Sequence, residues 1–174
     1  MAAETLTANQ AAATVIPSGH GYSGTVKAAV GTYSISVAAL EDGDIFEMCW
    51  LPPNALVIGG MFYCGDLDTG TEAVDIDVGW AANTGAATYL DKDGTTWTNS
   101  GASASAAGFV NSGVLTGDVI ADLLAAGSNM RPFPMATGPL FFSGKTMVQI
   151  EVNAAQATPQ AGVATVVVYY VIIA

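Results

Sequence analysis

The sequence predicts an all-β protein, an antiparallel β-sandwich that is jelly-roll-like, with one short helix and an extended N-terminal arm. Three observations predict this class. Short segments rich in Val, Ile, Tyr and Phe alternate apolar with polar residues, which is the period of a half-buried strand. Clusters of Gly, Pro, Asn and Asp separate these segments, as turns do. The chain has 174 residues, about one domain's worth and enough to bury a core without disulfides.

The arm is predicted over residues 1–24, which are rich in Ala, Thr, Ser and Gly. Its larger apolar residues are Leu6, Val15, Ile16 and Tyr22. Such a terminus is either loose, as exposed chain ends commonly are, or ordered against a neighbouring subunit. A single β-sandwich domain is expected to follow over 25–174.

The first predicted strands carry β-branched and aromatic residues between turn signals. They are 27–30, 33–39, 45–51 and 55–64. Gly31 separates the first two, a turn is expected at 41–44, and Pro52-Pro53-Asn54 closes the third strand. Gly59 and Gly60 lie inside the fourth strand, where glycine indicates a bulge or close packing.

The middle of the chain begins with the clearest half-buried strand, residues 73–80. There Val74, Ile76 and Val78 point to one side, and Asp75 and Asp77 to the other. Residues 81–112 have a weaker pattern, and we expect an ordered insertion or a loop with short strands.

The helix is predicted over 117–126, where apolar residues recur at helical spacing and Gly127 follows. An irregular Pro-rich stretch is expected at 131–139. Strand 147–153 alternates again, whereas 163–173 is apolar on both faces. In an antiparallel protein this pattern indicates a central strand that is covered on both sides or that lies in a subunit contact.

The charge balance limits the partners. Fifteen acidic residues against four basic ones give a net charge of −11, which argues against binding nucleic acid, because phosphates require a cationic surface. Only 11% of the residues are charged, so large apolar patches are expected on the surface, and such patches mark contacts.

A membrane anchor is not expected, because a spanning helix needs about 20 consecutive apolar residues. The longest apolar run, 163–174, is shorter and β-branched. The first ten residues lack a basic start and an apolar core, so no secretion signal is expected and the protein is predicted to be soluble and made in the cytoplasm.

Catalytic chemistry is not predicted. His20, the one histidine, lies in the arm, where a rigid geometry for base catalysis is hard to maintain. Cys49 and Cys64 have no neighbouring cation to lower their pKa, and if residues 51–55 form a hairpin the two thiols lie apart, so we expect free, buried thiols. The sequence holds no zinc spacing, phosphate loop or dinucleotide fingerprint. We therefore predict that the protein is not an enzyme and has no cofactor and no catalytic residue. The three tryptophans are expected to be core or interface anchors.

Paired carboxylates are the best candidate ligands. The three Asp-x-Asp pairs are Asp66 with Asp68, Asp75 with Asp77, and Asp91 with Asp93. Oxygen pairs of this kind suit Ca²⁺, but Asp91-Lys92-Asp93-Gly94 lacks the remaining ligands of a helix-loop-helix calcium site, and Asp-Gly is a common turn. Turn formation and a solvated strand face are the preferred interpretation, and no metal is predicted.

Two runs resemble small virion proteins of tailed phages. They are Leu40-Glu41-Asp42-Gly43-Asp44-Ile45-Phe46-Glu47-Met48 and Leu51-Pro52-Pro53-Asn54-Ala55-Leu56-Val57-Ile58-Gly59-Gly60. The strand from Val74 to Gly79, the strand from Gly162 to Val171 and the polar start Leu6-Thr7-Ala8-Asn9-Gln10 also fit. The resemblance covers roughly positions 40–80 and 145–173. Over these positions the chain is similar to capsid decoration or cement proteins and head fibres.

The resemblance implies a structural protein on the capsid surface of a virion, assembled in the host cytoplasm. Its expected partners are the major capsid protein and further copies of itself, with a homotrimer favoured. The expected interface residues are Leu6, Val15, Ile16 and Tyr22 in the arm and Val167, Tyr169, Val171 and Ile173 near the C-terminus.

The alternative is a receptor- or glycan-binding module of a head or tail fibre, because loops on β-sandwiches commonly carry recognition. It predicts that Trp97 and the loop around 91–101 are exposed to a ligand.

Overall fold

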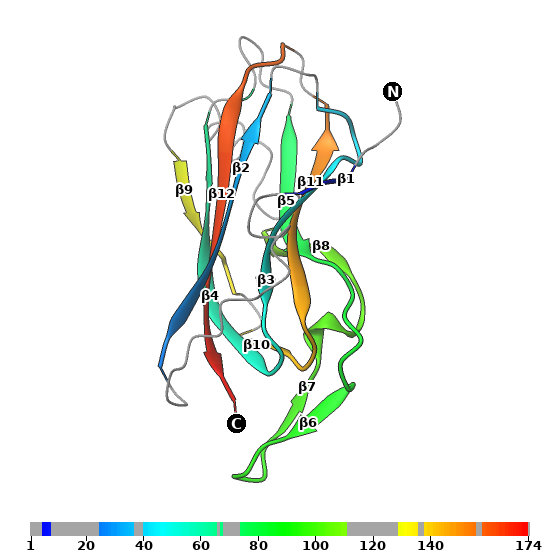
Figure 1. Cartoon of the computed structure of the whole chain (residues 1–174), viewed down its shortest axis with the longest axis vertical. Coiled ribbons are helices and arrows are strands. Elements are labelled where there is room, and N and C mark those ends of the chain that lie inside the picture. The colour runs from blue at the N-terminus through cyan, green and yellow to red at the C-terminus, as the bar shows by residue number, and fades with distance from the viewer. Residues whose placement is uncertain are drawn as a thin grey trace.

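Two large β-sheets packed face to face form most of the part of the chain that the computed structural model describes (Figure 1). The described residues are 5–7, 25–36, 40–65, 67, 74–110, 129–135, 138–155 and 158–173. The strands are β1 (Thr5–Thr7), β2 (Lys27–Ile35), β3 (Ile45–Leu51), β4 (Ala55–Cys64), β5 (Asp75–Trp80), β6 (Thr88–Leu90), β7 (Thr96–Thr98), β8 (Ser105–Val110), β9 (Asn129–Pro132), β10 (Leu140–Phe142), β11 (Thr146–Ala154) and β12 (Gly162–Ile172). One 3₁₀ turn, η1 (Ser100–Ala102), precedes β8.

Sheet A has the order β1-β3-β11-β5-β8, and sheet B has the order β10-β4-β12-β2, with β9 also pairing with β4. Four sets of pairs are nested: β2 with β12, β3 with β11, β4 with β9 and β10, and β5 with β8. Two further ladders, β4 with β12 and β5 with β11, join these pairs into the sheets. Each nested pair is antiparallel and lies inside the preceding one along the chain, as in a long hairpin that has been rolled up. This is the connectivity of a jelly roll, and the predicted fold class is confirmed.

The predicted strands at 45–51 and 55–64 match β3 and β4 residue for residue. The predicted break at Gly31 is wrong, because β2 runs unbroken through it. A Cβ atom at position 31 would meet the backbone carbonyl of Met48 in sheet A. Gly31 therefore marks a place where the two sheets approach closely, rather than a strand end.

Pro52-Pro53-Asn54 carries the chain from one sheet to the other. The conditional hairpin between β3 and β4 is wrong, because β3 pairs with β1 and β11, whereas β4 pairs with strands of sheet B. Asn54 takes a left-handed conformation with φ of 61°, and its carbonyl accepts a hydrogen bond from the Ile173 amide at 3.0 Å. Turn residues signal a change of direction, but they do not tell whether the flanking strands pair.

The expected irregularity at Gly59-Gly60 is confirmed. In the β4–β12 ladder Gly59 lies opposite Tyr169 and Val57 opposite Tyr170, so Ile58 is an extra, bulged residue. A Cβ atom on Gly60 would meet the ring of Phe133, so this glycine also allows close packing.

The stretch 81–112 contains short strands, as expected, over its described part. Strands β6 and β7 form a separate two-stranded sheet, and β8 joins sheet A. The helix predicted at 117–126 lies outside the described residues. Residues 131 and 132, predicted to be irregular, belong to β9 instead, because β4 offers that segment a partner edge.

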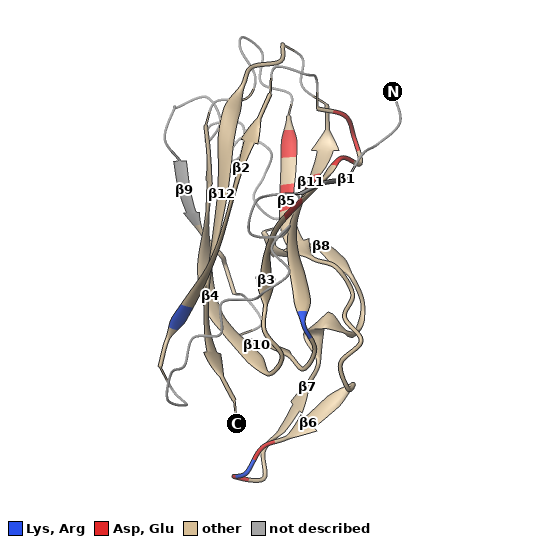
Figure 2. Cartoon of the chain, in the orientation of Figure 1, with Lys and Arg blue, Asp and Glu red and all other residues tan. Residues whose placement is uncertain are grey.

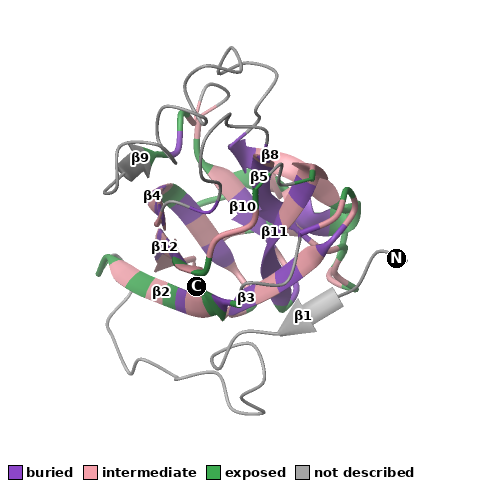
Figure 3. Cartoon of the chain, turned by 90° about the horizontal axis from the view of Figure 1, so that it is seen from above, coloured by how far each residue is buried: buried purple, intermediate pink, exposed green. Residues whose placement is uncertain are grey.

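The core lies between the sheets, as the purple band in Figure 3 shows. Val74, Ile76 and Val78 are buried there as predicted, but Asp77 on the opposite side of β5 is buried as well. Trp80 packs edge-on against Phe109 and Phe142, so it is the core anchor that was expected. Within the described part of the chain, no helix is long and apolar enough to span a bilayer.

Candidate interaction surfaces

The outer sides of β2, β12 and β4 in sheet B carry no charged side chain among the described residues, and we call this apolar surface the uncharged face. Its residues alternate along β2, β12 and β4 with residues that point into the core. They are Ala28, Val30, Thr32 and Ser34 on β2, Val163, Thr165, Val167, Tyr169 and Val171 on β12, and Leu56, Ile58, Gly59, Met61 and Tyr63 on β4. None of them is an Asp, Glu, Lys, Arg or His residue. Val30 and Ile58 are each 41% exposed, and Val163 is 46% exposed.

Polar atoms on the uncharged face bond to one another. The hydroxyls of Thr32 and Thr165 lie 3.1 Å apart across β2 and β12. The hydroxyl of Tyr63 donates to the sulfur of Met61 at 3.2 Å, and that of Tyr169 does so at 3.9 Å. Covering this face with another protein therefore removes few unsatisfied polar groups from water, which keeps the desolvation cost low.

The predicted interface residues fall into two groups. Val167, Tyr169 and Val171 lie together on the uncharged face, and Ile173 follows β12 and is half-buried. Leu6 lies in β1, opposite Phe46 in a parallel pair with β3. Val15, Ile16 and Tyr22 lie outside the described residues.

Sequence reasoning missed the residues that β2 and β4 add to this face, among them Val30, Ile58 and Met61. The signal was present in β2, where Ala28, Val30, Thr32 and Ser34 alternate with core residues. The bulge at Ile58 shifts the alternation of β4 by one residue, and the neighbouring Gly59 and Gly60 indicate an irregularity without telling which side chains it turns outward.

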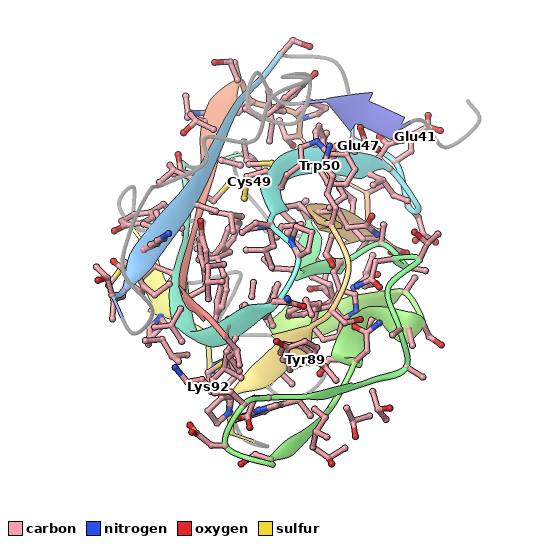
Figure 4. All side chains as sticks on the ribbon, turned by 60° about the horizontal axis from the view of Figure 1, so that its bottom comes forward. Glu41, Glu47, Cys49, Trp50, Tyr89 and Lys92 are labelled. Carbon is pink, nitrogen blue, oxygen red and sulfur yellow. The ribbon has the colours of Figure 1, made fainter. Side chains whose placement is uncertain are left out.

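The strands of sheet A carry acidic residues (Figure 2), which are Glu47 on β3, Asp75 and Asp77 on β5, and Glu151 on β11. In the ladders Glu151 lies opposite Asp77, and Gln149 lies opposite Glu47. Figure 4 shows Glu47 and Trp50 on the outer side of β3, with Cys49 on the side that faces sheet B. The Lys145 ammonium lies 3.9 Å from the centre of the Trp50 ring. The two faces of the sandwich thus differ sharply in charge.

The cysteines, the histidine and the aspartate pairs were the candidates for chemistry in the sequence. Cys49 and Cys64 form no disulfide and are buried, as predicted, and burial raises the pKa of the Cys49 thiol to about 12. His20, Asp66 and Asp68 lie outside the described residues. Among the residues that are described, no three His, Cys, Asp or Glu side chains are grouped as metal ligands would be.

The Asp91 carboxylate closes its own turn. One oxygen accepts hydrogen bonds from the amides of Asp93 at 3.0 Å and Thr95 at 2.8 Å, and the other accepts from the Trp97 indole N–H at 2.9 Å. These bonds, that of Trp97 first, lower the pKa of the Asp91 carboxyl. Both carboxylate oxygens of Asp91 are therefore used within the turn, as the turn interpretation of this Asp-x-Asp pair predicts.

Trp97 is held within the β6–β7 hairpin. It lies opposite Tyr89 in the ladder, and both rings pack on Phe141, with centroid distances of 6.1 Å for Trp97 and 5.6 Å for Tyr89. Its indole N–H is bound by Asp91 and its side chain is half-buried. The fibre alternative predicted that Trp97 and the loop around it are exposed; residues 92–96 are exposed, whereas Trp97 is half-buried and bound by Asp91.

Two asparagines fix the base of the hairpin, and we call them the asparagine clasp. Asn99 donates from Nδ2 to Asn83 Oδ1 at 2.9 Å, and Asn83 donates from Nδ2 to Thr146 Oγ1 at 2.7 Å. Each side-chain oxygen also accepts from the amide two residues on, that of Gly85 at 2.9 Å and that of Gly101 at 3.0 Å. The clasp ties both ends of the hairpin to the start of β11.

Close packing surrounds the asparagine clasp. A Cβ atom on Gly101 would meet the Asn83 amide, and one on Gly85 would meet Gly144. Sequence reasoning missed the clasp, although its signal is visible as two Asn-x-Gly runs, Asn83-Thr84-Gly85 and Asn99-Ser100-Gly101. Asparagine followed by glycine two residues on is typical of side-chain-closed turns.

Comparisons with known proteins place the fold. No protein-family model matches the sequence. No curated protein matches it either. Among solved structures, a chain of the cyanophage Pam1 capsid asymmetric unit is 26% identical with a TM-score of 0.58, over 94% of this chain and 96% of that one. A chain of the capsid of Ralstonia phage GP4 is 20% identical with a TM-score of 0.56, over 98% of this chain and 99% of that one. The protein therefore shares its fold, over nearly its whole length, with chains of two phage capsids.

Proposed function

We propose that this protein is a structural virion subunit of a tailed phage that decorates or cements the capsid surface as a homo-oligomer, with a trimer favoured. The observation that carries the proposal is the uncharged face on an otherwise acidic chain. Copies that each carry a net charge of −11 repel one another, so they associate best through a surface without carboxylates.

The contrast between the sheets supports one orientation of the subunit in the oligomer. An uncharged, partly exposed apolar face gains free energy when another copy removes it from water. The outer side of sheet A, with the partly exposed Glu47 and Glu151, stays in solvent and keeps the assembly soluble. Around a three-fold axis, one face turned toward the axis contacts both neighbouring copies.

The size of the uncharged face suits one contact among several. Three strands spaced about 4.8 Å apart and about 30 Å long cover roughly 400 Å². A stable pairwise interface takes about 800 Å² from each partner. The face alone is therefore a modest contact, which oligomerisation and repeated attachment to a shell multiply.

The capsid likeness supports the same proposal, since a chain of the Pam1 capsid matches nearly the whole of this one at 26% identity. The proposed partners are the major capsid protein and further copies of this chain, and the proposed place is the outside of the shell. The arm residues Leu6, Val15, Ile16 and Tyr22 remain predicted contacts with a neighbouring subunit.

The proposal is tested by two measurements on the purified full-length chain. Light scattering is expected to give an oligomer, and co-sedimentation with shells built from the phage's major capsid protein is expected to give saturable binding. Val30→Glu places a charge on the uncharged face at a side chain that is already 41% exposed, and Ile58→Glu does the same on β4. Both are expected to dissociate the oligomer.

The matched control is Asn153→Glu, which adds the same charge at a half-buried position of β11 in sheet A and is expected to leave the oligomer intact. A wild-type chain that is monomeric and does not bind shells contradicts the proposal. Oligomers of Val30→Glu and Ile58→Glu that are as stable as the wild type contradict the role of the uncharged face.

A further inference from the structure

The β6–β7 hairpin projects beyond the end of the sandwich at which β12 ends (Figure 1). Each of its strands has only three residues. A two-stranded ribbon of this size has marginal stability in water on its own. The ordered shape of the hairpin therefore depends on the contacts that fix its tip, its inner side and its base.

Contacts fix the tip, the inner side and the base of the hairpin. The Asp91 carboxylate closes the tip with three hydrogen bonds. Tyr89 and Trp97 attach the inner side to Phe141, which is 2% exposed. The asparagine clasp holds the base. A projecting element built in this way loses little conformational freedom when it meets a partner, which favours binding.

The outer side of the hairpin carries a leucine whose side chain is exposed to solvent. Leu90 lies opposite Thr96, and its side chain is 65% exposed, the largest value among the large hydrophobic side chains in the described part of the chain. Thr88, Thr96 and Thr98 around it are exposed and uncharged. A single large apolar side chain on a rigid protrusion is the form of an anchor that fills a pocket of a partner.

We propose that the β6–β7 hairpin is a preformed docking element and that Leu90 inserts into an apolar socket on a shell subunit. This inference rests on the proposed function and adds to it the part of the chain that contacts the shell. It separates two contacts: the uncharged face joins copies of this chain, and the hairpin joins them to the shell.

Charge disfavours a second copy as the occupant, and the likeness to a capsid chain supports a shell subunit instead. The tip carries Asp91 and Asp93 against Lys92. The outer side of sheet A on another copy is acidic and repels such a tip, and the uncharged face is already assigned to contacts between copies. A partner that is not itself acidic avoids this repulsion.

The test compares Kd values for shells, measured by co-sedimentation with the full chain. Leu90→Asp is expected to weaken binding at least tenfold and to leave the oligomeric state and the circular dichroism spectrum unchanged. Leu90→Met is expected to bind within about threefold of the wild type, because methionine fills apolar sockets of similar volume. The charge-matched control is Ser103→Asp, at an exposed position outside the hairpin, and is expected to have no effect.

A photo-crosslinking residue at position 90 identifies the occupant. A product that joins this chain to the shell subunit is expected. A product between two copies of this chain, or no product, overturns the inference, as does wild-type affinity of Leu90→Asp. If the wild-type chain itself fails to bind shells, both the inference and the proposed function fail, whereas shell binding with an insensitive position 90 overturns the inference alone.

Discussion

Asn83 and Asn99 turn their carboxamides toward each other, with Asn99 Nδ2 2.9 Å from Asn83 Oδ1 and Asn83 Nδ2 3.4 Å from Asn99 Oδ1. The pair joins the two ends of an excursion from the sandwich, and Asn99 is only 4% exposed. Both side-chain oxygens also accept backbone N–H groups. A buried amide pair with its polar atoms bonded fixes geometry in a way that apolar contacts do not.

Replacing Asn99 by alanine is expected to lower the free energy of unfolding by about 2 kcal/mol or more, because donors on Gly101, Ser143 and Asn83 lose their acceptor. Urea denaturation measures the change. Asn153→Ala, at a half-buried position in β11, is the control and is expected to change stability by less than about 0.5 kcal/mol. Equal stability of the two variants would show that the clasp is not structural.

Gly31→Ala and Gly59→Ala separate two kinds of glycine in sheet B. A Cβ at position 31 meets the Met48 backbone, whereas a Cβ at position 59 meets nothing within 4 Å. Overpacking is expected to cost Gly31→Ala about 1–3 kcal/mol. Gly59→Ala is expected to be neutral or slightly stabilising, since alanine restricts the unfolded chain. Thermal melts of both variants check this, and a harmless Gly31→Ala would contradict the close approach of β2 and β3.

The Cys49 thiol makes stability depend on pH at the alkaline end. Burial raises its pKa from 9.0 to about 12, so the unfolded chain releases the proton first. The stabilising contribution is complete below pH 9 and is lost as the pH rises toward 12. At about 1.4 kcal/mol per pH unit, roughly 2 kcal/mol is lost between about pH 9 and about pH 10.5.

Urea unfolding at about pH 8 and about pH 10.5 measures this loss, and Cys49→Ala is expected to reduce it. Tyr170, whose pKa is raised by burial and then by Cys49, contributes a remaining loss in the same direction. Rapid alkylation of Cys49 in the native protein at neutral pH would contradict its burial.

The Asp91 carboxyl makes the hairpin tip sensitive to acid. Its pKa is lowered by Trp97 and by backbone amides, so the bonds that hold the tip are complete at neutral pH and are lost as the pH falls through the lowered pKa. Asp91→Asn is expected to mimic this loss at neutral pH, because an amide N–H in place of the second oxygen cannot accept the indole N–H.

The measurement is faster hydrogen exchange of the Thr95 amide and the Trp97 indole N–H in Asp91→Asn. Asp93→Asn is the matched control in the same turn. An exchange rate in Asp91→Asn equal to that of the wild type would show that the carboxylate does not hold the tip.

Periodicity predicted most of the sandwich because its strands are short, bounded by turns and buried on one side. β3 and β4 follow from β-prone residues bounded by turn signals, and the core side of β5 follows from alternation. Alternation does not specify which strands pair, so it does not distinguish a hairpin after Leu51 from a crossing between the two sheets. A glycine in a strand pattern, such as Gly31, indicates either a strand end or a close approach of backbone from another sheet, and the sequence does not tell which.

The make-up of the uncharged face was predicted in part. The two-sided apolar pattern of 163–173 indicated a contact strand, and Val167, Tyr169 and Val171 do share an outer face. The contribution of β2 and β4 arises from pairing between segments far apart along the chain, as between Thr32 and Thr165. The asparagine clasp is likewise a long-range product of the fold, although its two Asn-x-Gly turns are local.

Cryo-EM reconstruction of phage shells carrying this protein tests the central claim most directly. The account predicts a jelly-roll density on the outside of the shell, with the uncharged faces of neighbouring copies turned toward one another and the β6–β7 hairpins toward the shell. Shells that remain bare after incubation with a monomeric chain, or copies whose uncharged faces point into solvent, would contradict it.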